Sequence, residues 1–420
     1  MKSPFLVLFF LLLFFFLVDL YVARGVKTLY SSLSQDSFAR YAVWVHWLFF
    51  GVTVVAYLIA FSGIFSFKNH ENYRFFYFLF GLTLLFYIPK LFFGLFMLVD
   101  DVWWVLRKLY HVSGLSSFSR SEPYRPDRLA FLYRIGAVTA AVPFAAAAYG
   151  MLKGRWDFRV VNETLVSSKI PEAFNGFKVV QFSDAHLGSF FNNIKPVEEA
   201  LKIMNSLEPD IIVFTGDMVN NYAAEAEKWI PYFKKLKAKH GKYAVLGNHD
   251  YGGYGQYSSA DGKERNFDRL IEIISEMDFQ LLRNEHAVIE KNQQRIDLLG
   301  VENWGIKPFP QLGDVNKAKA GSSSPFKILL SHDPSHWDAE ILPRHRDIDL
   351  TLSGHTHGAQ FGVELGNIKW SPVKYKYERW GGMYTEGEQK LYVNRGFGYI
   401  GFPGRVGMPP EITCFTLRST

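Results

Sequence analysis

The sequence contains very little cysteine: Cys414 is the only one in 420 residues. A single cysteine excludes an intramolecular disulfide framework and any zinc or iron–sulfur site built from several thiolates. An excess of one charge is also lacking, because 46 Lys and Arg against 40 Asp and Glu give a net charge of only +6. A nucleic-acid-binding protein would be expected to concentrate basic residues in a stripe, so no nucleic-acid partner is indicated. A nucleotide-binding loop with its lysine and a Gly-x-Ser-x-Gly motif are both missing.

Long apolar runs, by contrast, are abundant in the first part of the chain. Four of them lie within residues 1–153, at Pro4–Ala23, Tyr41–Phe67, Phe75–Val99 and Ile135–Leu152. About twenty apolar residues are needed for a helix to cross the hydrocarbon core of a bilayer. Residues 1–153 are therefore predicted to form a transmembrane anchor of four helices. A cleaved signal peptide is the alternative for the first run, but a small-residue cleavage site is not evident after it.

A few polar residues interrupt these runs. Asp19 and His46 lie near the ends of their runs and are expected at the membrane interface, and Lys90 is expected to extend its amino group toward the headgroups. A transport path is the less favoured alternative. The stretch Asp101–Tyr110 is predicted to be an amphipathic interfacial segment. Lys and Arg are slightly more numerous in the first and third loops of this multi-pass membrane protein than on the opposite side. Positively charged loops tend to stay in the cytoplasm, so this distribution favours an extracytoplasmic catalytic domain. The difference is too small to decide the face.

Residues 154–420 have a different pattern, in which short apolar runs alternate with helical periodicity. Seven runs are predicted to be buried strands: Lys178–Ser183, Ile211–Thr215, Tyr243–Leu246, Arg295–Val301, Lys327–Ser331, Leu350–Ser353 and Lys390–Asn394. Helices are predicted at Pro196–Leu207, Ala224–Lys239 and Asn266–Met277. Strands interspersed with helices predict an α/β domain in which helices flank the sheets.

Polar clusters follow five of these strands, at Ser183–His186, Thr215–Asp217, Leu246–Asp250, Ser331–Asp333 and Ser353–His357. Open α/β sheets bind their ligands at the carboxyl ends of the strands. In Asp-x-His and His-x-His the two side chains fall on the same side of an extended backbone, so both can reach one metal ion. Carboxylates, an amide and imidazoles without thiolates suit Mn²⁺, Fe²⁺/Fe³⁺ or Zn²⁺. One such cluster is usually an ordinary turn, but five in this order are not expected by chance.

This order of motifs resembles the calcineurin-like metallophosphoesterase superfamily over about residues 155 to 420. The four apolar runs resemble the membrane-anchored branch of that superfamily, the transmembrane proteins with a metallophosphoesterase domain. The resemblance implies a four-layer αββα sandwich with a dinuclear metal centre for residues 154–420.

The resemblance also implies a role for each motif residue. Asp184, His186, Asp217 and His357 would hold the first of two divalent metal ions, and Asp217, Asn248, His332 and His355 the second, with Asp217 shared. His249 would bind no metal and would stabilise the transition state or protonate the leaving group. Asp250 would orient the His249 imidazole.

The implied enzyme is a membrane-anchored phosphohydrolase that cleaves a phosphoester or pyrophosphate bond with a metal-activated hydroxide. Anchorage favours an amphiphilic substrate, and similar enzymes that cleave UDP-2,3-diacylglucosamine in lipid A synthesis supply a candidate, which requires a cytoplasmic domain. Aromatic residues in Tyr251–Glu264 and Phe361–Tyr384, with Phe190 and Phe191, either form a rim toward lipid or pack against one another. No obligatory protein partner is indicated. The alternative is a non-catalytic membrane receptor or scaffold, which would be expected to have lost a ligand or His249.

Overall fold

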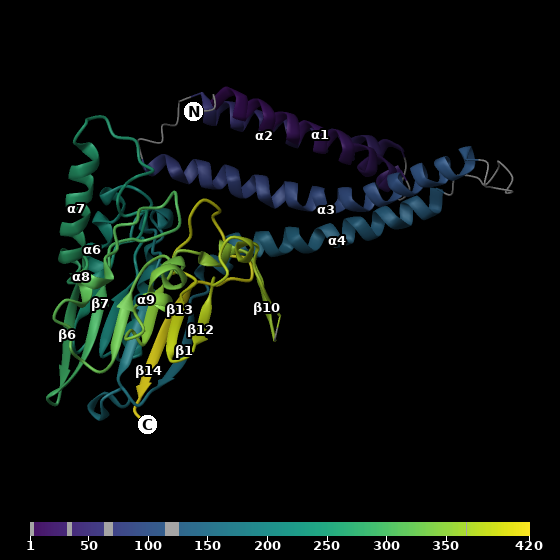
Figure 1. Cartoon of the computed structure of the whole chain (residues 1–420). Helices are drawn as coiled ribbons and strands as arrows, with labels where there is room; N and C mark the ends of the chain where they lie inside the picture. Colours follow the sequence, from purple (N-terminus) through teal and green to yellow (C-terminus); the bar gives the residue numbers. More distant parts are fainter. Residues whose placement is uncertain (1–3, 32–35, 63–69, 114–125, 367) are drawn as a thin grey trace. The chain divides into compact units, whose positions relative to one another are not determined.

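The computed structural model describes residues 4–31, 36–62, 70–113, 126–366 and 368–420 (Figure 1). The chain divides into two compact units. The membrane unit contains the long N-terminal helices through Tyr149, and the sheet unit contains residues 150–420 together with the start of the third helix through Tyr77.

Four long helices account for the apolar runs: α1 Pro4–Ser31, α2 Asp36–Phe61, α3 Tyr73–Val112 and α4 Pro126–Leu152. Each is long and apolar enough to cross a membrane, which confirms the predicted count within the described residues. The stretch Asp101–Tyr110, predicted to be interfacial, is a continuous part of α3, because neither glycine nor proline interrupts it. The described residues do not include the end of the second predicted run or the loops 63–69 and 114–125. The charges of these loops bear on the predicted orientation in the membrane.

A polar cluster joins three helices inside the membrane unit. The Lys90 amino group lies 2.5 Å from Asp19 Oδ1, and His46 Nε2 lies 3.0 Å from the same oxygen. The Tyr87 hydroxyl donates to Asp19 Oδ2 at 2.6 Å, and Asp19 is completely buried. The expectation of an extended Lys90 is therefore wrong, and Asp19 is the buried partner of both Lys90 and His46. A charge in hydrocarbon is costly, and pairing between helices removes the need to reach the headgroups.

Two six-stranded sheets form the centre of the sheet unit. The first sheet has the order β1 (Arg159–Val166), β14 (Glu411–Arg418), β2 (Lys178–Phe182), β3 (Ile211–Phe214), β4 (Lys242–Ala244), β5 (Gln280–Leu281). The second has the order β12 (Gly382–Glu386), β13 (Gln389–Val393), β9 (Leu350–Ser353), β8 (Lys327–Leu330), β7 (Gln294–Gly300), β6 (Glu285–Lys291). Strands β2 to β5 are parallel to one another, with Val180 opposite Ile212, and so are β7, β8, β9 and β13. All seven predicted strands are present, to within two residues at each end.

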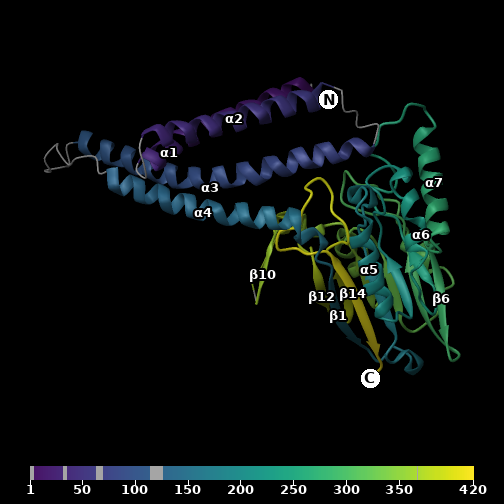
Figure 2. The same ribbon diagram turned by 180° about the vertical axis from the view of Figure 1, so that it is seen from behind.

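Helices cover the outer face of each sheet. Three helices pack on the first sheet, α5 (Ile194–Ser206), α6 (Ile230–Phe233) and α7 (Gly262–Glu276), and α5 can be followed beside β14 in Figure 2. Two short helices, α8 (Val315–Lys319) and α9 (Leu342–Arg344), follow β7 and β8 in the chain, and residues of α8 share an outer core with the second sheet. The sequence predicts a single helix over Ala224–Lys239, but only α6 is α-helical there. Pro231 lacks an amide hydrogen and so sits in the first turn of α6 instead of a helix interior.

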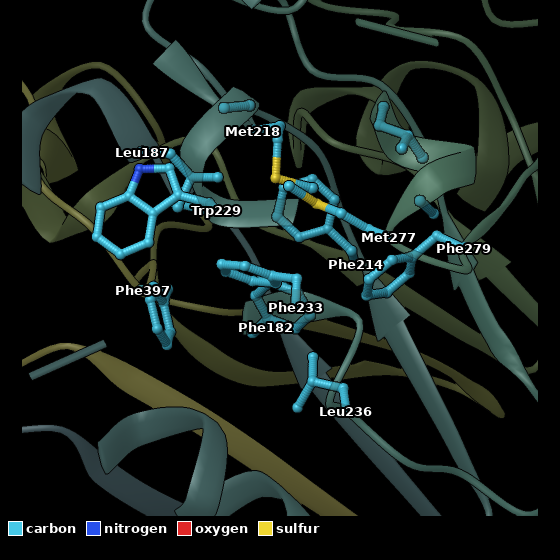
Figure 3. Packing of buried hydrophobic residues seen from close by; sticks show 14 of the residues in the cluster. Phe182, Leu187, Phe214, Met218, Trp229, Phe233, Leu236, Met277, Phe279 and Phe397 are labelled. Carbon is cyan, nitrogen blue, oxygen red and sulfur yellow. The ribbon is translucent and has the colours of Figure 1, made fainter. Parts of the chain in front are cut away.

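Three buried cores separate the four layers. Successive side chains of a strand point to opposite faces, so Phe182 of β2 and Phe214 of β3 pack against Phe233 and the other helical residues, as Figure 3 shows. Val179 of β2 and Val213 of β3 point to the opposite face and lie in the core between the two sheets. The third core lies on the outer face of the second sheet. This arrangement confirms the αββα sandwich and brings the carboxyl ends of both parallel strand sets to the site described next.

Candidate metal centre

The predicted ligands lie directly after five parallel strands. Asp184 and His186 follow β2, Asp217 follows β3, and Asn248 follows β4. On the second sheet, His332 follows β8, and His355 and His357 follow β9. The ends of the two sheets meet where His332 Nδ1 donates to the Thr215 carbonyl at 2.8 Å. The fold therefore collects residues from two sheets at one place.

The backbone of the site is strained. Positive φ angles between 43° and 70° occur at five of the predicted ligands: Asp184, His186, Asp217, His355 and His357. Residues other than glycine rarely adopt this left-handed conformation, and such strain is concentrated at functional sites. Space is equally tight at Gly354, where a Cβ atom would lie 1.9 Å from Ser183 Oγ. A side chain at position 354 would therefore require Ser183 to move.

Asp184, His186 and His357 form the first group that could hold a metal ion. The two Nε2 atoms of His186 and His357 are 3.1 Å apart, and His357 Nε2 lies 3.3 Å from Asp184 Oδ1. Burial lowers the pKa of His186 to about 3 and that of His357 well below its usual value. Both imidazoles are therefore neutral at physiological pH, as metal ligands must be.

Asp217, His332 and His355 form the second group. Asp217 Oδ2 lies 3.2 Å from His332 Nε2 and 3.7 Å from His186 Nε2 of the first group. Burial would raise the pKa of Asp217, but the nearby charges of His332 and His249 hold it well below its usual value. The Asp217 carboxylate is therefore ionised and lies between the two groups, as a shared ligand would.

Asn248 supplies a further oxygen. Its side-chain nitrogen donates to the Tyr254 hydroxyl at 3.0 Å, whereas its Oδ1 is buried and has no hydrogen-bond partner among the described residues. A buried acceptor without a partner is costly unless something else binds it. Two carboxylates, four imidazoles and this amide oxygen form a donor set that fits two divalent cations.

His249 belongs to neither group and is partly exposed. Its Nδ1 lies 2.6 Å from the Asn220 carbonyl oxygen, and its ring centre lies 5.0 Å from that of His186. A carbonyl oxygen only accepts, so Nδ1 carries the hydrogen and Nε2 is left for a reacting group. Its backbone N–H donates to Asp217 Oδ1 at 2.8 Å, which fixes the loop beside the metal ligands.

The structure corrects the expected contact of Asp250. Its carboxylate accepts backbone N–H groups of Gly247, Asp217, Met218 and Val219 at 2.8–3.3 Å. In the part of the chain that the structure describes, it makes no hydrogen bond to the His249 ring, and the Asn220 carbonyl takes that position. The reason is a tight turn closed by Asp250 N–H and the Gly247 carbonyl, which directs the carboxylate under the Asp217 loop.

Aromatic side chains frame the site, and sequence reasoning identified only some of them. The Tyr377 hydroxyl lies 2.7 Å from His355 Nε2, and the Tyr254 ring centre lies 4.7 Å from that of His249. Phe309, whose ring centre lies 4.9 Å from that of His355, has no local sequence signal. For Trp380 and Phe190, the structure favours packing over a rim toward lipid, because both are buried in hydrophobic clusters.

A C-terminal segment supports the ligand loops. Phe397 N–H donates to the Ser183 carbonyl at 2.7 Å, and Gly398 N–H donates to the Asp184 carbonyl at 2.8 Å. Arg405 is buried, donates to the Gly398 carbonyl, and places Nη2 3.2 Å from His357 Nδ1. Burial lowers the pKa of Arg405 to about 9, which still leaves it charged at neutral pH.

Comparisons with known proteins agree with this geometry. Residues 3–155 match the family model "Probable Calcineurin-like phosphoesterase, transmembrane domain", and residues 177–359 match "Calcineurin-like phosphoesterase". The chain is 34% identical to "Uncharacterized metallophosphoesterase YkuE" of Bacillus subtilis, over 68% of this chain and 95% of that protein. It is 29% and 28% identical to proteins of Danio rerio and Bos taurus named "Transmembrane protein with metallophosphoesterase domain", over 68% and 67% of this chain, and spans 63% and 62% of their lengths. The chain belongs to the calcineurin-like phosphoesterase family and is a metal-dependent phosphoesterase with a four-helix transmembrane region.

Proposed function

We propose that the chain hydrolyses a phosphodiester or pyrophosphate bond in an amphiphilic, membrane-associated substrate. The observation that supports this most directly is the position of Asp217, whose carboxylate lies between two groups that each contain two imidazoles. The first cation would be held by Asp184, His186 and His357 together with Asp217. The second would be held by Asp217, Asn248, His332 and His355.

Bound Mn²⁺, Fe²⁺/Fe³⁺ or Zn²⁺ would supply a water-derived nucleophile at neutral pH and neutralise charge on the phosphoryl oxygens. The chain's own residues provide orientation and a proton. With Nδ1 held by the Asn220 carbonyl, the protonated His249 ring would deliver a proton from Nε2 to the leaving oxygen. Tyr254 would hold the Asn248 amide with its oxygen free, and Tyr377 would fix the His355 ring through Nε2, leaving Nδ1 as its ligand atom.

The substrate class follows from the anchor and from the aromatic frame of the site. A soluble nucleotide needs no membrane-bound enzyme, whereas a phosphorylated lipid is found only at the bilayer. UDP-2,3-diacylglucosamine is one amphiphile of this kind, and no described residue singles it out from other lipid phosphodiesters. A receptor or scaffold would have no need for the complete donor set and His249, so the non-catalytic alternative is not favoured.

The test uses the full chain in lipid nanodiscs, stripped with a chelator and reloaded separately with Mn²⁺, Fe²⁺ or Zn²⁺. We expect metal-dependent hydrolysis of bis-p-nitrophenyl phosphate, followed by hydrolysis of lipid phosphodiesters and of UDP-2,3-diacylglucosamine embedded in the disc. Asp217→Asn should lose metal and activity, while Asp261→Asn, at an exposed surface position, should lose neither. Two bound metals per chain without hydrolysis of any phosphoester would favour the receptor alternative.

The face of the membrane narrows the substrates further. Paired fusions of alkaline phosphatase and a fluorescent protein after Thr420 report that face, and we expect the exported reporter to be active. That result excludes the nucleotide-linked candidate and directs the search to envelope phospholipids. Activity of the cytoplasmic reporter alone makes UDP-2,3-diacylglucosamine the first substrate to test.

A further inference from the structure

A small hairpin follows the last metal-ligand loop. Its strands β10 (Val363–Leu365) and β11 (Ile368–Trp370) pair with each other and with neither six-stranded sheet. Figure 1 shows the hairpin, labelled β10, projecting away from β12 and β13. Ser371, the residue after β11, donates through its hydroxyl to the Gly358 carbonyl at 2.7 Å, which ties the hairpin to the loop that carries His357.

In this hairpin the charged face contacts the domain and the apolar face is exposed, which is the reverse of an antiparallel sheet in a soluble protein. Residues directly opposite each other share a face, and the register pairs Val363 with Trp370, Leu365 with Ile368, and Glu364 with Lys369. One face is therefore entirely apolar and the other is charged. Antiparallel sheets in soluble proteins bury the apolar face and expose the polar one.

The charged face of the hairpin is the one that contacts the domain. Glu364 Oε1 lies 2.5 Å from Arg395 Nη2, while Lys369 donates to the Gly381 carbonyl and lies 4.8 Å from the centre of the Trp380 ring. These contacts fix which way the hairpin faces.

The apolar face is left open. Leu365 is 72% exposed, Ile368 63%, Val363 50% and Trp370 40%. Four adjacent exposed apolar side chains on one face indicate an interaction surface.

The base of the hairpin is joined to the end of the last membrane helix. Gly150, in the final turn of α4, accepts a hydrogen bond from Arg405 N–H at 3.1 Å. The next residue, Val406, accepts from Gly362 N–H at 2.9 Å, immediately before β10. A Cβ atom on Gly150 would lie 2.7 Å from Val406 Cγ2, so the two segments pack closely. The hairpin thus begins two backbone hydrogen bonds from Gly150, in the last turn of α4.

Residues beside the hairpin have the composition of a membrane interface. Lys374, Tyr375 and Lys376 are all exposed, and Tyr375 is 77% exposed. Tyrosine and tryptophan prefer the headgroup level of a bilayer, and lysines near it are attracted to anionic lipids. Cationic and aromatic residues that follow an apolar face in the chain match a lipid surface better than a protein partner.

We propose that hairpin β10–β11 inserts its apolar face into the surface of the bilayer, with Lys374 and Lys376 at the headgroups. Insertion would hold the metal-ligand loop against the lipid, so that the phosphate of an amphiphile reaches the site while its acyl chains stay in the membrane. The insertion itself does not depend on catalysis, whereas its effect on substrate choice rests on the proposed function.

Depth-dependent quenching tests the insertion. Leu365→Cys is labelled with the fluorophore NBD in the full chain in nanodiscs, beside Val288→Cys, an exposed apolar residue on edge strand β6. Labelling of the unmodified chain measures the background from the buried Cys414. We expect blue-shifted emission at 365 and several-fold stronger quenching by nitroxide-labelled acyl chains than at 288. Equal quenching at both positions overturns the proposal. So does blue-shifted emission without lipid quenching, which would indicate a protein partner or a second copy of the chain.

A second variant separates insertion from catalysis. Leu365→Glu combined with Ile368→Glu should reduce hydrolysis of a disc-embedded lipid phosphodiester at least tenfold and leave hydrolysis of soluble bis-p-nitrophenyl phosphate unchanged. An equal loss toward both substrates would refute the role in substrate access. If the unmodified chain hydrolyses neither substrate, the proposed function fails, and the quenching result still decides the insertion.

Discussion

The substitution Asp250→Asn separates two accounts of this residue. If Asp250 oriented the His249 ring, the variant would keep its fold and metals and lose only turnover. The structure predicts the opposite, because the carboxylate holds four backbone N–H groups of the two loops that carry Asp217 and Asn248. One carboxylate oxygen accepts from Asp217 and Gly247, and the other from Met218 and Val219.

The expected loss can be calculated from these contacts. An asparagine keeps one acceptor oxygen and turns an amino group toward the other two donors, so two charge-assisted hydrogen bonds are lost. At about 1.5–3 kcal/mol each, the free energy of unfolding should fall by roughly 3–6 kcal/mol. For a domain of this size that corresponds to a decrease in Tm of roughly 6–24 °C. Because Asp217 also loses its support, metal affinity should fall about 10–100-fold.

The assay compares the unmodified chain, Asp250→Asn and the surface control Asp261→Asn in detergent, by thermal unfolding and by metal content after dialysis. Burial raises the pKa of Asp250 to about 7, so the comparison is made at about pH 8, where the carboxylate is ionised. Asp261→Asn should match the unmodified chain in both measurements. An Asp250→Asn protein with unchanged Tm and full metal content but a greatly reduced kcat would refute this reasoning and restore the ring-orienting role.

Three further predictions concern other parts of the chain. His249→Ala should retain both metals, since the ring belongs to neither ligand group, and should reduce turnover by roughly 10²–10⁴; loss of metal in this variant would contradict the assignment. Asp19→Ala should destabilise the detergent-solubilised chain by about 3–5 kcal/mol because it leaves Lys90 buried without its partner, and the double variant Asp19→Ala/Lys90→Met should recover much of that loss. Burial lowers the pKa of His332, but the adjacent Asp217 charge outweighs it and raises that pKa to about 10. Metal binding must displace this proton, so affinity measured by calorimetry should rise with pH by up to about tenfold per unit through neutrality; a pH-independent affinity would disprove the protonated state.

Much of the fold is encoded in local sequence patterns. The seven strands predicted for residues 154–420 have apolar runs that end at polar or glycine-containing turns, and each is found within two residues of its expected position. The strands without a clear sequence pattern include β1 and β14. These two strands pair with each other over eight positions, although they lie near opposite ends of the sequence of residues 154–420. Strand β1 is the edge strand, and only one of its eight residues is buried, so its run has no continuous apolar pattern. Strand β14 is mostly buried, but Glu411, Thr413 and Thr416 interrupt its apolar run.

For the site, too, the sequence pattern identified some residues and not others. The motifs, read through their resemblance to a known family, include every residue of the two groups that could hold a metal ion, because such a centre requires chemically distinctive side chains after each strand. The partners of those residues carried no such signal. Phe309 and Arg405 are ordinary residues that reach the site from distant parts of the chain. Asn220 lies only three residues after Asp217, but it contributes its backbone carbonyl, which no side-chain pattern reveals.

The sequence by itself therefore determined the four membrane helices, the order of the strands' polar clusters and the chemistry of the ligand set, all of which depend on residues close together in the chain. Only the tertiary structure decided that Lys90 pairs with Asp19, that Asp250 supports the Asp217 loop, and that the charged face of the β10–β11 hairpin contacts the domain. The physical reason is that a charged side chain can satisfy its hydrogen bonds with water, with a neighbour or with a distant backbone group. Periodicity and turn chemistry do not distinguish these, because the choice depends on which groups the packed layers bring within about 3 Å.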